Sequence, residues 1–497
     1  MDGTLSGVLL GFEVALQPIN LMYVFLGVVI GMVIGILPGL GPAATVALLL
    51  PVTFAIPPDS AVIALAGIYY GAYYGGTITS VLLNIPGEAA SVVTTFDGYQ
   101  MALQGRAGPA LGIAAIGSFI GGMVSVLGLI LFAPYLAEIA LTFGPPEYTS
   151  LALVGLLLVT YLGTASFLKS LLTACLGLLC AVVGIDIISG DARFSFGSTN
   201  MLGGLDFVAI AMGLFGLGEV LYNLETRGGG QTEALRRTRA WPTMADWIHS
   251  RGAILRGSAL GFFIGLLPGG GGLVSSLASY GVEKRIAKDP GRFGKGAIEG
   301  VAGPETANNA GSTAAFIPLL TLGIPPNVVL ALIYGALLLQ GIPPGPQLIT
   351  DHPGIFWGVI CSMAIGNIML IILNIPLVGI FIKILKVRSS IMAALVVLVT
   401  MVGVYSVNNS VFDMWVMLVF GVVGYAMRKS GFEPGPLALA FVLGPLLEES
   451  FRQSLLISDG RFSVFVTRPV SGFILAVALL VVGYSTFNYL RRKRSKP

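Results

Sequence analysis

Apolar stretches alternate with short polar segments along the whole chain. A transmembrane helix needs about 20 consecutive, mostly apolar residues. Stretches that approach or exceed this length lie at residues 20–37, 60–85, 110–134, 150–163, 168–188, 205–223, 355–385, 391–407, 412–427 and 470–490. Shorter or interrupted apolar stretches lie between them. The pattern therefore predicts an all-α polytopic membrane protein with about ten to twelve transmembrane segments.

Two of the apolar stretches end in the same broken-helix motif. Its residues are Gly27, Gly31, Gly35, Leu37, Pro38, Gly39 and Gly41 in the first half, and Gly257, Gly261, Gly265, Leu267, Pro268, Gly269 and Gly271 in the second. Proline lacks an N–H and clashes with the preceding turn, so the motif stops a helix and leaves backbone groups that lipid cannot satisfy. Paired breaks in corresponding halves indicate the binding site of a transporter.

The repeat continues beyond the first break. Residues 75–80, 83–88 and 102–105 find counterparts, in the same order, at residues 308–313, 322–327 and 338–341. We therefore predict two membrane repeats joined by a cytoplasmic linker. The first repeat occupies residues 1–223 and the linker residues 224–253. The second repeat occupies residues 254–497, which include a basic C-terminal tail.

Charge predicts the orientation of these repeats. Basic residues cluster at 227–256, 284–295 and 491–496, and such clusters face the cytoplasm. A single crossing between the first two clusters would place one of them on the wrong side. We therefore expect a re-entrant hairpin that turns at 268–272, with a first arm of about 10–14 residues, too short to cross. The matching loop at 56–59 has no basic residue, as inverted repeats require. The alternative is two ordinary helices with a glycine kink.

Composition excludes several other classes. With 55% hydrophobic and 10% charged residues, the composition is that of a membrane protein. The net charge is +3, and because the basic residues lie in short loops and not on one continuous surface, it does not indicate nucleic-acid binding. Cys175, Cys180 and Cys361 lack the spacing of a metal or redox motif, and the two histidines lie in polar loops. No metal-based or histidine-based catalysis is predicted, and no cofactor.

Polar residues gather beside the breaks, where they are costly in lipid unless paired or functional. The candidate substrate- or cation-binding residues are Gly39, Gly41, Thr79, Ser80, Asn84, Glu88, Gly269, Gly271, Glu305, Asn308, Asn309, Ser312 and Thr313, with further hydroxyls at Thr77 and Thr321. The alternative is that they only join helices by hydrogen bonds. Glu88 and Glu305 follow prolines, so each either caps a helix or serves a cation site. Asp97 is interpreted as a turn or cap residue.

Basic residues placed to bind an anion directly are few. Arg106, Lys169, Arg193 and Arg452 are the exceptions, and most long basic side chains reach to a membrane interface. An anionic substrate would then be recognised mainly by backbone amides and hydroxyls, for which half-helix N-termini and the glycines at 269–272 are suited.

Several motifs in one order resemble the large membrane subunit of tripartite tricarboxylate transporters, and the match spans nearly the whole chain. They lie at residues 35–42, 70–76, 84–91, 97–99, 105–108, 265–271, 304–310, 320–325 and 444–452. The resemblance implies a bacterial inner-membrane permease, which works with a small four-helix membrane subunit and a periplasmic solute-binding protein. It also implies import of tricarboxylates, dicarboxylates or related organic anions, driven by a Na⁺ or H⁺ gradient. The absence of a Walker motif agrees with this.

Two other classes of function compete with transport. A passive organic-anion channel would also tolerate paired re-entrant breaks. A membrane-embedded aspartyl enzyme would have to use Asp186 and Asp191, which lie five residues apart on one stretch, whereas a dyad normally draws its acids from separate elements. We therefore predict that the chain is not an enzyme.

Overall fold

The computed structural model describes residues 2–37, 41–162, 166–186, 188–226, 241–384 and 389–480. Helices make up 80% of the structure, which confirms the all-α class. Among the described residues, the only sheet is a two-stranded antiparallel pair of β1 (Gly184–Ile185) and β2 (Ala192–Arg193). Gly39 and the basic C-terminal tail lie outside the described residues.

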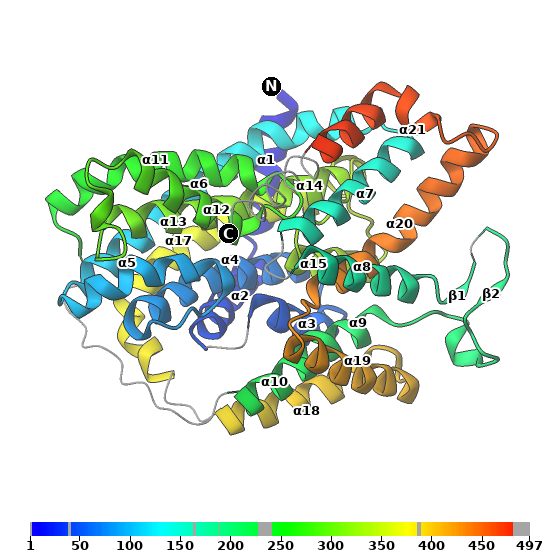
Figure 1. Ribbon diagram of the computed structural model, residues 1–497, viewed down its shortest axis with the longest axis horizontal. Coiled ribbons are helices and arrows are strands. Elements are labelled where there is room, and N and C mark those ends of the chain that lie inside the picture. Colours follow the sequence, from blue (N-terminus) through cyan, green and yellow to red (C-terminus); the bar gives the residue numbers. More distant parts are fainter. Residues whose placement is uncertain are drawn as a thin grey trace, which may run out of the picture.

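The helices lie side by side, and the β1–β2 hairpin projects from the helical body (Figure 1). Those of the first half are α1 (Asp2–Ala15), α2 (Pro18–Ile36), α3 (Pro42–Thr53), α4 (Pro58–Leu83), η1 (Ala89–Ser91), α5 (Val92–Leu103), α6 (Ala107–Ala140), α7 (Pro145–Leu162), α8 (Phe167–Ala181), η2 (Thr199–Met201), α9 (Phe207–Ala211), the π-helical η3 (Met212–Leu217) and α10 (Gly218–Thr226). Those of the second half are α11 (Met244–Gly265), α12 (Gly271–Ile286), η4 (Pro290–Arg292), α13 (Glu299–Ala314), α14 (Phe316–Leu322), α15 (Val328–Leu339), α16 (Leu348–Asp351), α17 (Pro353–Ile384), α18 (Ser389–Asn408), α19 (Val411–Lys429), α20 (Gly435–Ile457) and α21 (Val464–Thr467).

Five stretches of the described chain are long and apolar enough to cross a membrane. They are α2, α6, the continuous stretch from α9 to α10, the first 22 residues of α17, and α19. Six shorter apolar helices accompany them. The protein is therefore a multi-pass membrane protein, while the count of ten to twelve crossings stays a prediction.

Both predicted breaks separate a long helix from a short one. At 1.5 Å per residue, the 12 residues of α3 and the 16 of α12 span about 18 and 24 Å, less than the ~30 Å of a bilayer core. The helix before the second break, α11, has 22 residues, so the predicted length of about 10–14 residues for the first arm was wrong. It extends back to a capping box between Thr243 and Asp246, inside the segment assigned to the linker.

The repeated glycines pack each long arm against the helix after the short one. A Cβ on Gly31 of α2 would lie 2.5 Å from the carbonyl oxygen of Ile68 in α4. A Cβ on Gly261 of α11 would lie 2.3 Å from the carbonyl oxygen of Ala307 in α13. Both distances are shorter than a van der Waals contact, so only glycine lets these backbones approach so closely.

The next connection also has the same local geometry in both halves. Asn84 ends α4 and Gly323 ends α14, each in the left-handed conformation, with φ of 57° and 68°. The following isoleucine donates its N–H six residues back, from Ile85 to Thr79 at 3.4 Å and from Ile324 to Pro318 at 3.2 Å. The repeat is thus visible in hydrogen bonding and packing, while the inverted orientation of the two halves stays a prediction.

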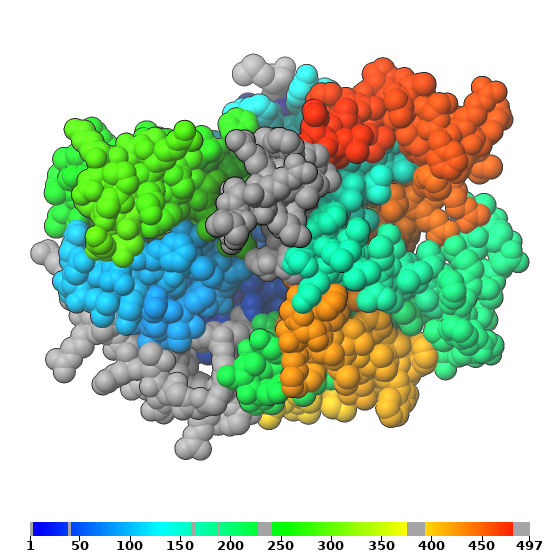
Figure 2. All heavy atoms as spheres, in the orientation of Figure 1, coloured from blue at the N-terminus to red at the C-terminus, as the bar shows by residue number. Residues whose placement is uncertain are grey.

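Each half has a long helix that packs against helices of the other half, so the two halves share one core. Helix α6 packs on α11 and α13 of the second half, whereas α17 packs on α2 and α4 of the first. Gln104 donates its side-chain N–H to the carbonyl oxygen of Lys295, and Gln340 donates to that of Thr53, both at 2.8 Å. In Figure 2 the light-blue α5 region lies directly against the green α12 region. The two halves are therefore packed against each other as one unit.

Candidate functional site

Glu305 of α13 is the centre of a buried polar cluster. Its side chain is fully buried, and both carboxylate oxygens accept hydrogen bonds. Thr94 of α5 donates to Oε1, while Thr77 of α4 donates to Oε2 at 2.8 Å. The side-chain amide of Asn308 donates to Oε2 at 3.3 Å. Donors from three helices therefore fix this carboxylate in place.

Asn309 extends the cluster to a fourth helix. Its side-chain amide donates to Ser118 Oγ of α6 at 2.8 Å and to Asn308 Oδ1 at 2.6 Å. It also donates to the backbone oxygen of Glu305 at 3.1 Å, to which Ser118 donates as well, at 3.2 Å. The predicted residues Glu305, Asn308 and Asn309 are thus brought together, and they join helices of both halves.

Glu88 lies beside this cluster but is only partly satisfied. It caps η1, because its Oε2 accepts the N–H of Ala90 at 3.0 Å. The side chain is 9% exposed, and its Oε1 has no hydrogen-bond partner. Its charge interacts electrostatically with Glu305 and with the hydroxyl groups of Tyr69 and Tyr73. Glu88 therefore both caps a helix and presents an open carboxylate oxygen in the interior.

The two tyrosines connect Glu88 to the second break. Tyr73 donates its hydroxyl to Tyr69 at 3.3 Å, and Asn327 donates its side-chain amide to the Tyr69 hydroxyl at 3.0 Å. A Cβ on Gly272 would lie 2.5 Å from the ring of Tyr73, so the absence of a side chain lets this ring pack against the backbone at the start of α12. The carboxylate and the broken helix thus share one polar region.

The N-termini of α3 and α12 carry no side-chain cap. Gly41 precedes α3 and Gly270 precedes α12, and neither has a side-chain oxygen to accept an N–H of the first turn. Gly269 bridges the two breaks of the second half, because its N–H donates to the carbonyl oxygen of Pro326 at 2.8 Å. Gly269 and Gly271 have φ of 75° and 44°, in the left-handed region that favours glycine. The first N–H groups of an uncapped helix are suited to bind an anion.

Other predicted residues have local partners. Thr79 and Ser80 both donate to the carbonyl oxygen of Gly76, at 3.0 and 2.9 Å. Ser312 donates to the carbonyl oxygen of Asn309 at 3.0 Å, and Thr313 is buried on the same helix. Asn84 is exposed and serves as the left-handed residue that ends α4. These contacts alone assign no ligand to them.

The four basic residues singled out from the sequence all have partners away from this cluster. Arg106 pairs with Asp246. Lys169 donates to the carbonyl oxygen of Ser430 at 2.6 Å. Arg193 pairs with Glu448 at 2.6 Å and Arg452 with Asp186 at 2.8 Å. The hydrogen bonds from Arg452 hold the pKa of Asp186 well below its usual range.

Asp97 does not have the predicted role in a turn or at the cap of its own helix. It lies inside α5, where its Oδ1 accepts the N–H groups of Gly294, Gly296 and Ala297 at 2.9, 2.8 and 2.8 Å. Tyr280 donates its hydroxyl to Oδ2 at 3.0 Å. Asp97 thus fixes the loop between α12 and α13 onto the first half.

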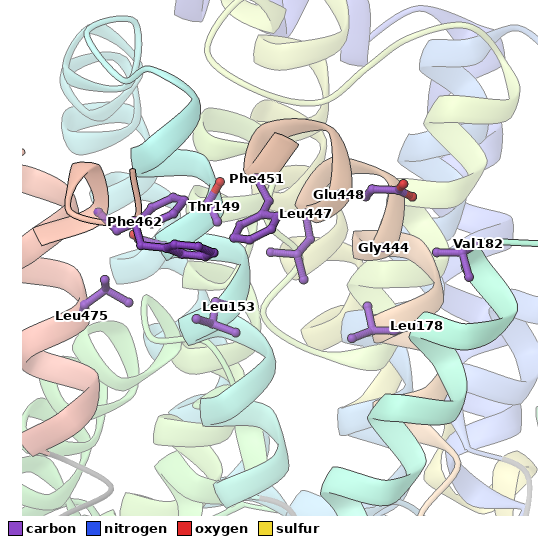
Figure 3. Close-up of a pocket in the computed structure, with 12 residues that line it drawn as sticks. Thr149, Leu153, Leu178, Val182, Gly444, Leu447, Glu448, Phe451, Phe462 and Leu475 are labelled. Carbon is purple, nitrogen blue, oxygen red and sulfur yellow. The ribbon is translucent and has the colours of Figure 1, made fainter. Parts of the chain in front are cut away.

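An apolar cavity lies away from this polar cluster. Its volume is about 440 Å³, and it is bounded by α7, α8 and α20. Figure 3 shows that the side chains of Leu153, Leu178, Leu447, Phe451 and Phe462 line it. None of the predicted site residues contributes to its wall. This apolar space is therefore separate from the polar cluster at the breaks.

Helices from both halves that meet around buried carboxylates, hydroxyls and amides, beside helix breaks, are expected of a membrane transporter. The model of the tripartite tricarboxylate transporter TctA family matches residues 21–439. The chain belongs to this family, and the resemblance noted in the sequence is confirmed. It is a family of transporter subunits, not of enzymes.

Two relatives from Agrobacterium vitis are similar to this chain. An uncharacterized 52.8 kDa protein in the TAR-I ttuC' 3' region is 48% identical over 496 residues, which cover 100% of this chain and 99% of the relative. An uncharacterized protein in the TAR-II ttuC' 3' region is 50% identical over 236 residues, which cover 48% of this chain and 98% of the relative. No solved structure matches the chain.

Proposed function

We propose that this chain is the large permease subunit of a binding-protein-dependent secondary transporter that imports carboxylates. The observation that carries the proposal is the buried cluster around Glu305 and Glu88, where helices of both halves meet beside the second break. Polar groups at membrane depth beside broken helices are expected where a substrate or ion binds. Membership of the transporter family supplies the substrate class.

The carboxylate group of the substrate is expected at the uncapped N-terminus of α12. Unpaired N–H groups and the positive end of the helix dipole favour an anion there. The residues that approach this end, Tyr73 and the glycines, are uncharged, and the basic residues discussed above are engaged elsewhere. Recognition would therefore rest on backbone amides and hydroxyls. Specificity would also depend on the protein that delivers the substrate.

Two partner proteins and a coupling ion complete the proposed system. A periplasmic solute-binding protein delivers the carboxylate, and a small four-helix membrane subunit associates with this chain in the bacterial inner membrane. The coupling ion is Na⁺ or H⁺. Because the sequence has no Walker motif, ATP is not expected to drive the step. The basic C-terminal tail is expected on the cytoplasmic side.

Uptake into vesicles tests the proposal. The two membrane subunits are reconstituted, and radiolabelled citrate, succinate or an aromatic acid is added with the binding protein under an inward Na⁺ or H⁺ gradient. We expect accumulation that requires both the gradient and the binding protein. Equal uptake with the gradient collapsed and ATP supplied would contradict the proposal. Flux that neither saturates nor depends on the binding protein would favour the passive channel.

A further inference from the structure

Two buried carboxyl groups lie in the same region without a basic partner. Glu88 and Glu305 come from different halves, and the charge of Glu305 acts on Glu88. Within the described residues, neither forms an ion pair with a lysine, arginine or histidine. Two uncompensated negative charges in the interior are costly, because burial removes the water that would stabilise them. A proton or a bound cation would relieve this cost.

The hydrogen bonds show which of the two acids is free to hold that charge. Glu305 accepts from Thr94, Thr77 and Asn308, so both of its oxygens are engaged. Glu88 has one engaged oxygen, and its Oε1 has no partner. A buried acceptor without a donor is uncommon in folded proteins, and a bound proton, ion or water is one way to satisfy it.

An independent observation comes from the helix that packs against Glu88. Helix α12 contacts η1, the short helix that Glu88 caps. On α12, one turn after Gly272, Ser276 is fully buried, and its hydroxyl also has no hydrogen-bond partner. Two packed elements thus each contain an unpartnered buried oxygen. Carboxylate and hydroxyl oxygens are ligands that suit a small hard cation, and a hydroxyl also accepts a hydrogen bond from a protonated carboxyl.

We propose that a monovalent cation, Na⁺ or a proton, binds at Glu88 Oε1 in the interface between η1 and α12, with Ser276 as its neutral partner. Resting on the transport function proposed above, this makes Glu88 the residue that couples the ion gradient to carboxylate movement. The cation adjoins α12, whose N-terminus is the expected anion site. Each ligand therefore strengthens binding of the other by the same factor, as linkage requires.

Cation binding is measured on the purified full-length chain, without substrate or partner proteins. Its thermal unfolding is followed in detergent while NaCl replaces choline chloride at constant ionic strength, and separately across pH 5–9. We expect the unfolding temperature of the natural chain to rise with Na⁺ for a sodium site, or to change with pH for a proton site. In the proton case, the titratable groups that interact with Glu88 are Glu305, Tyr69 and Tyr73.

The variants decide where the cation binds. Glu88→Gln keeps the shape but removes the charge and should abolish the response. Ser276→Ala should raise the cation concentration at half-response about three- to ten-fold, the usual effect of losing one neutral hydrogen-bonding partner. Glu138→Gln, at an exposed position of α6, is the matched control and should respond like the natural chain. If Glu88→Gln does not fold, Glu88→Asp replaces it, with an expected shift of at least ten-fold.

Two results overturn the inference: a natural chain that responds neither to Na⁺ nor to pH, and a Glu88 variant that responds as the natural chain does. Either result leaves gradient-driven uptake to be judged by the vesicle experiment. Conversely, a Glu88-dependent cation response in a chain that transports no carboxylate would contradict the proposed function and leave the cation site standing.

Discussion

Glu88 and Asn327 occupy matched positions in the two halves, and each caps the helix that follows. Glu88 Oε2 accepts the N–H of Ala90 at 3.0 Å, and Asn327 Oδ1 accepts that of Leu330 at 3.1 Å. The remaining atoms differ, because Asn327 donates its amide to Tyr69, whereas Glu88 leaves Oε1 open. The two halves thus share the helix cap at this position, but only the first half has a carboxylate there.

The Glu305 cluster should contribute to stability through Thr94. Thr94→Val keeps the side-chain volume but removes a hydrogen bond to a buried carboxylate. We expect a loss of about 1–2 kcal/mol, measured as a lower midpoint of thermal or denaturant unfolding in detergent. Thr95→Val is the matched control, because Thr95 bonds only to the carbonyl oxygen of Val92 in its own helix. Equal effects of the two substitutions would show that the contact with Glu305 contributes nothing special.

The close approach of α11 to α13 should tolerate no side chain at Gly261. The Cβ of Gly261→Ala would meet a backbone oxygen that cannot move independently, so we expect loss of folded protein on size-exclusion chromatography. Gly281→Ala in α12 meets nothing within 4 Å. It should be neutral or stabilising by up to about 1 kcal/mol, because alanine favours helix. Normal yield of Gly261→Ala would refute the packing argument.

The sequence predicted the helical membrane class, the two breaks and the gathering of Glu305, Asn308 and Asn309, because these follow from local patterns of apolar residues, proline and glycine. It did not single out Thr94, Ser118, Tyr69 or Tyr73 as site residues. Thr94 lies 211 positions from its partner Glu305, and Ser118 lies 191 positions from Asn309. Such contacts depend on how α5 and α6 cross to the other half, which periodicity does not encode.

Asn84 should be needed for its backbone conformation. Its φ of 57° is strained for most residues but accessible to asparagine and glycine. We expect Asn84→Gly to retain the stability of the natural chain and Asn84→Ala to lose about 1 kcal/mol, as judged by unfolding midpoints. Uptake measured per folded molecule provides the second readout. A glycine variant that is stable but does not transport would contradict a purely structural role and would indicate that the Asn84 side chain contributes to the substrate site.

The β1–β2 hairpin should resist acid through Asp186. Because Arg452 lowers the pKa of Asp186, its stabilising contribution is present above the ordinary aspartate value near 4 and disappears only as the pH falls further. Hydrogen exchange of the peptide around Ile188, corrected for intrinsic rates, should therefore show equal protection at pH 7 and pH 4. Arg452→Gln should lose protection at both, and Arg461→Gln at neither. Protection in the natural chain that declines between pH 6 and pH 4 would contradict this reasoning.

The proposed transport function depends most on the two halves being inverted, because inverted repeats place corresponding loops on opposite sides of the membrane. The most direct test is the sidedness of two matched loops. After replacement of the three natural cysteines, single cysteines are introduced at Ala55, between α3 and α4, and at Lys288, between α12 and α13. Both positions are exposed. An impermeant maleimide is then applied to intact cells and to inverted vesicles. The account predicts labelling of Lys288→Cys only from the cytoplasmic side and of Ala55→Cys only from the opposite side, whereas labelling of both from one side would contradict it.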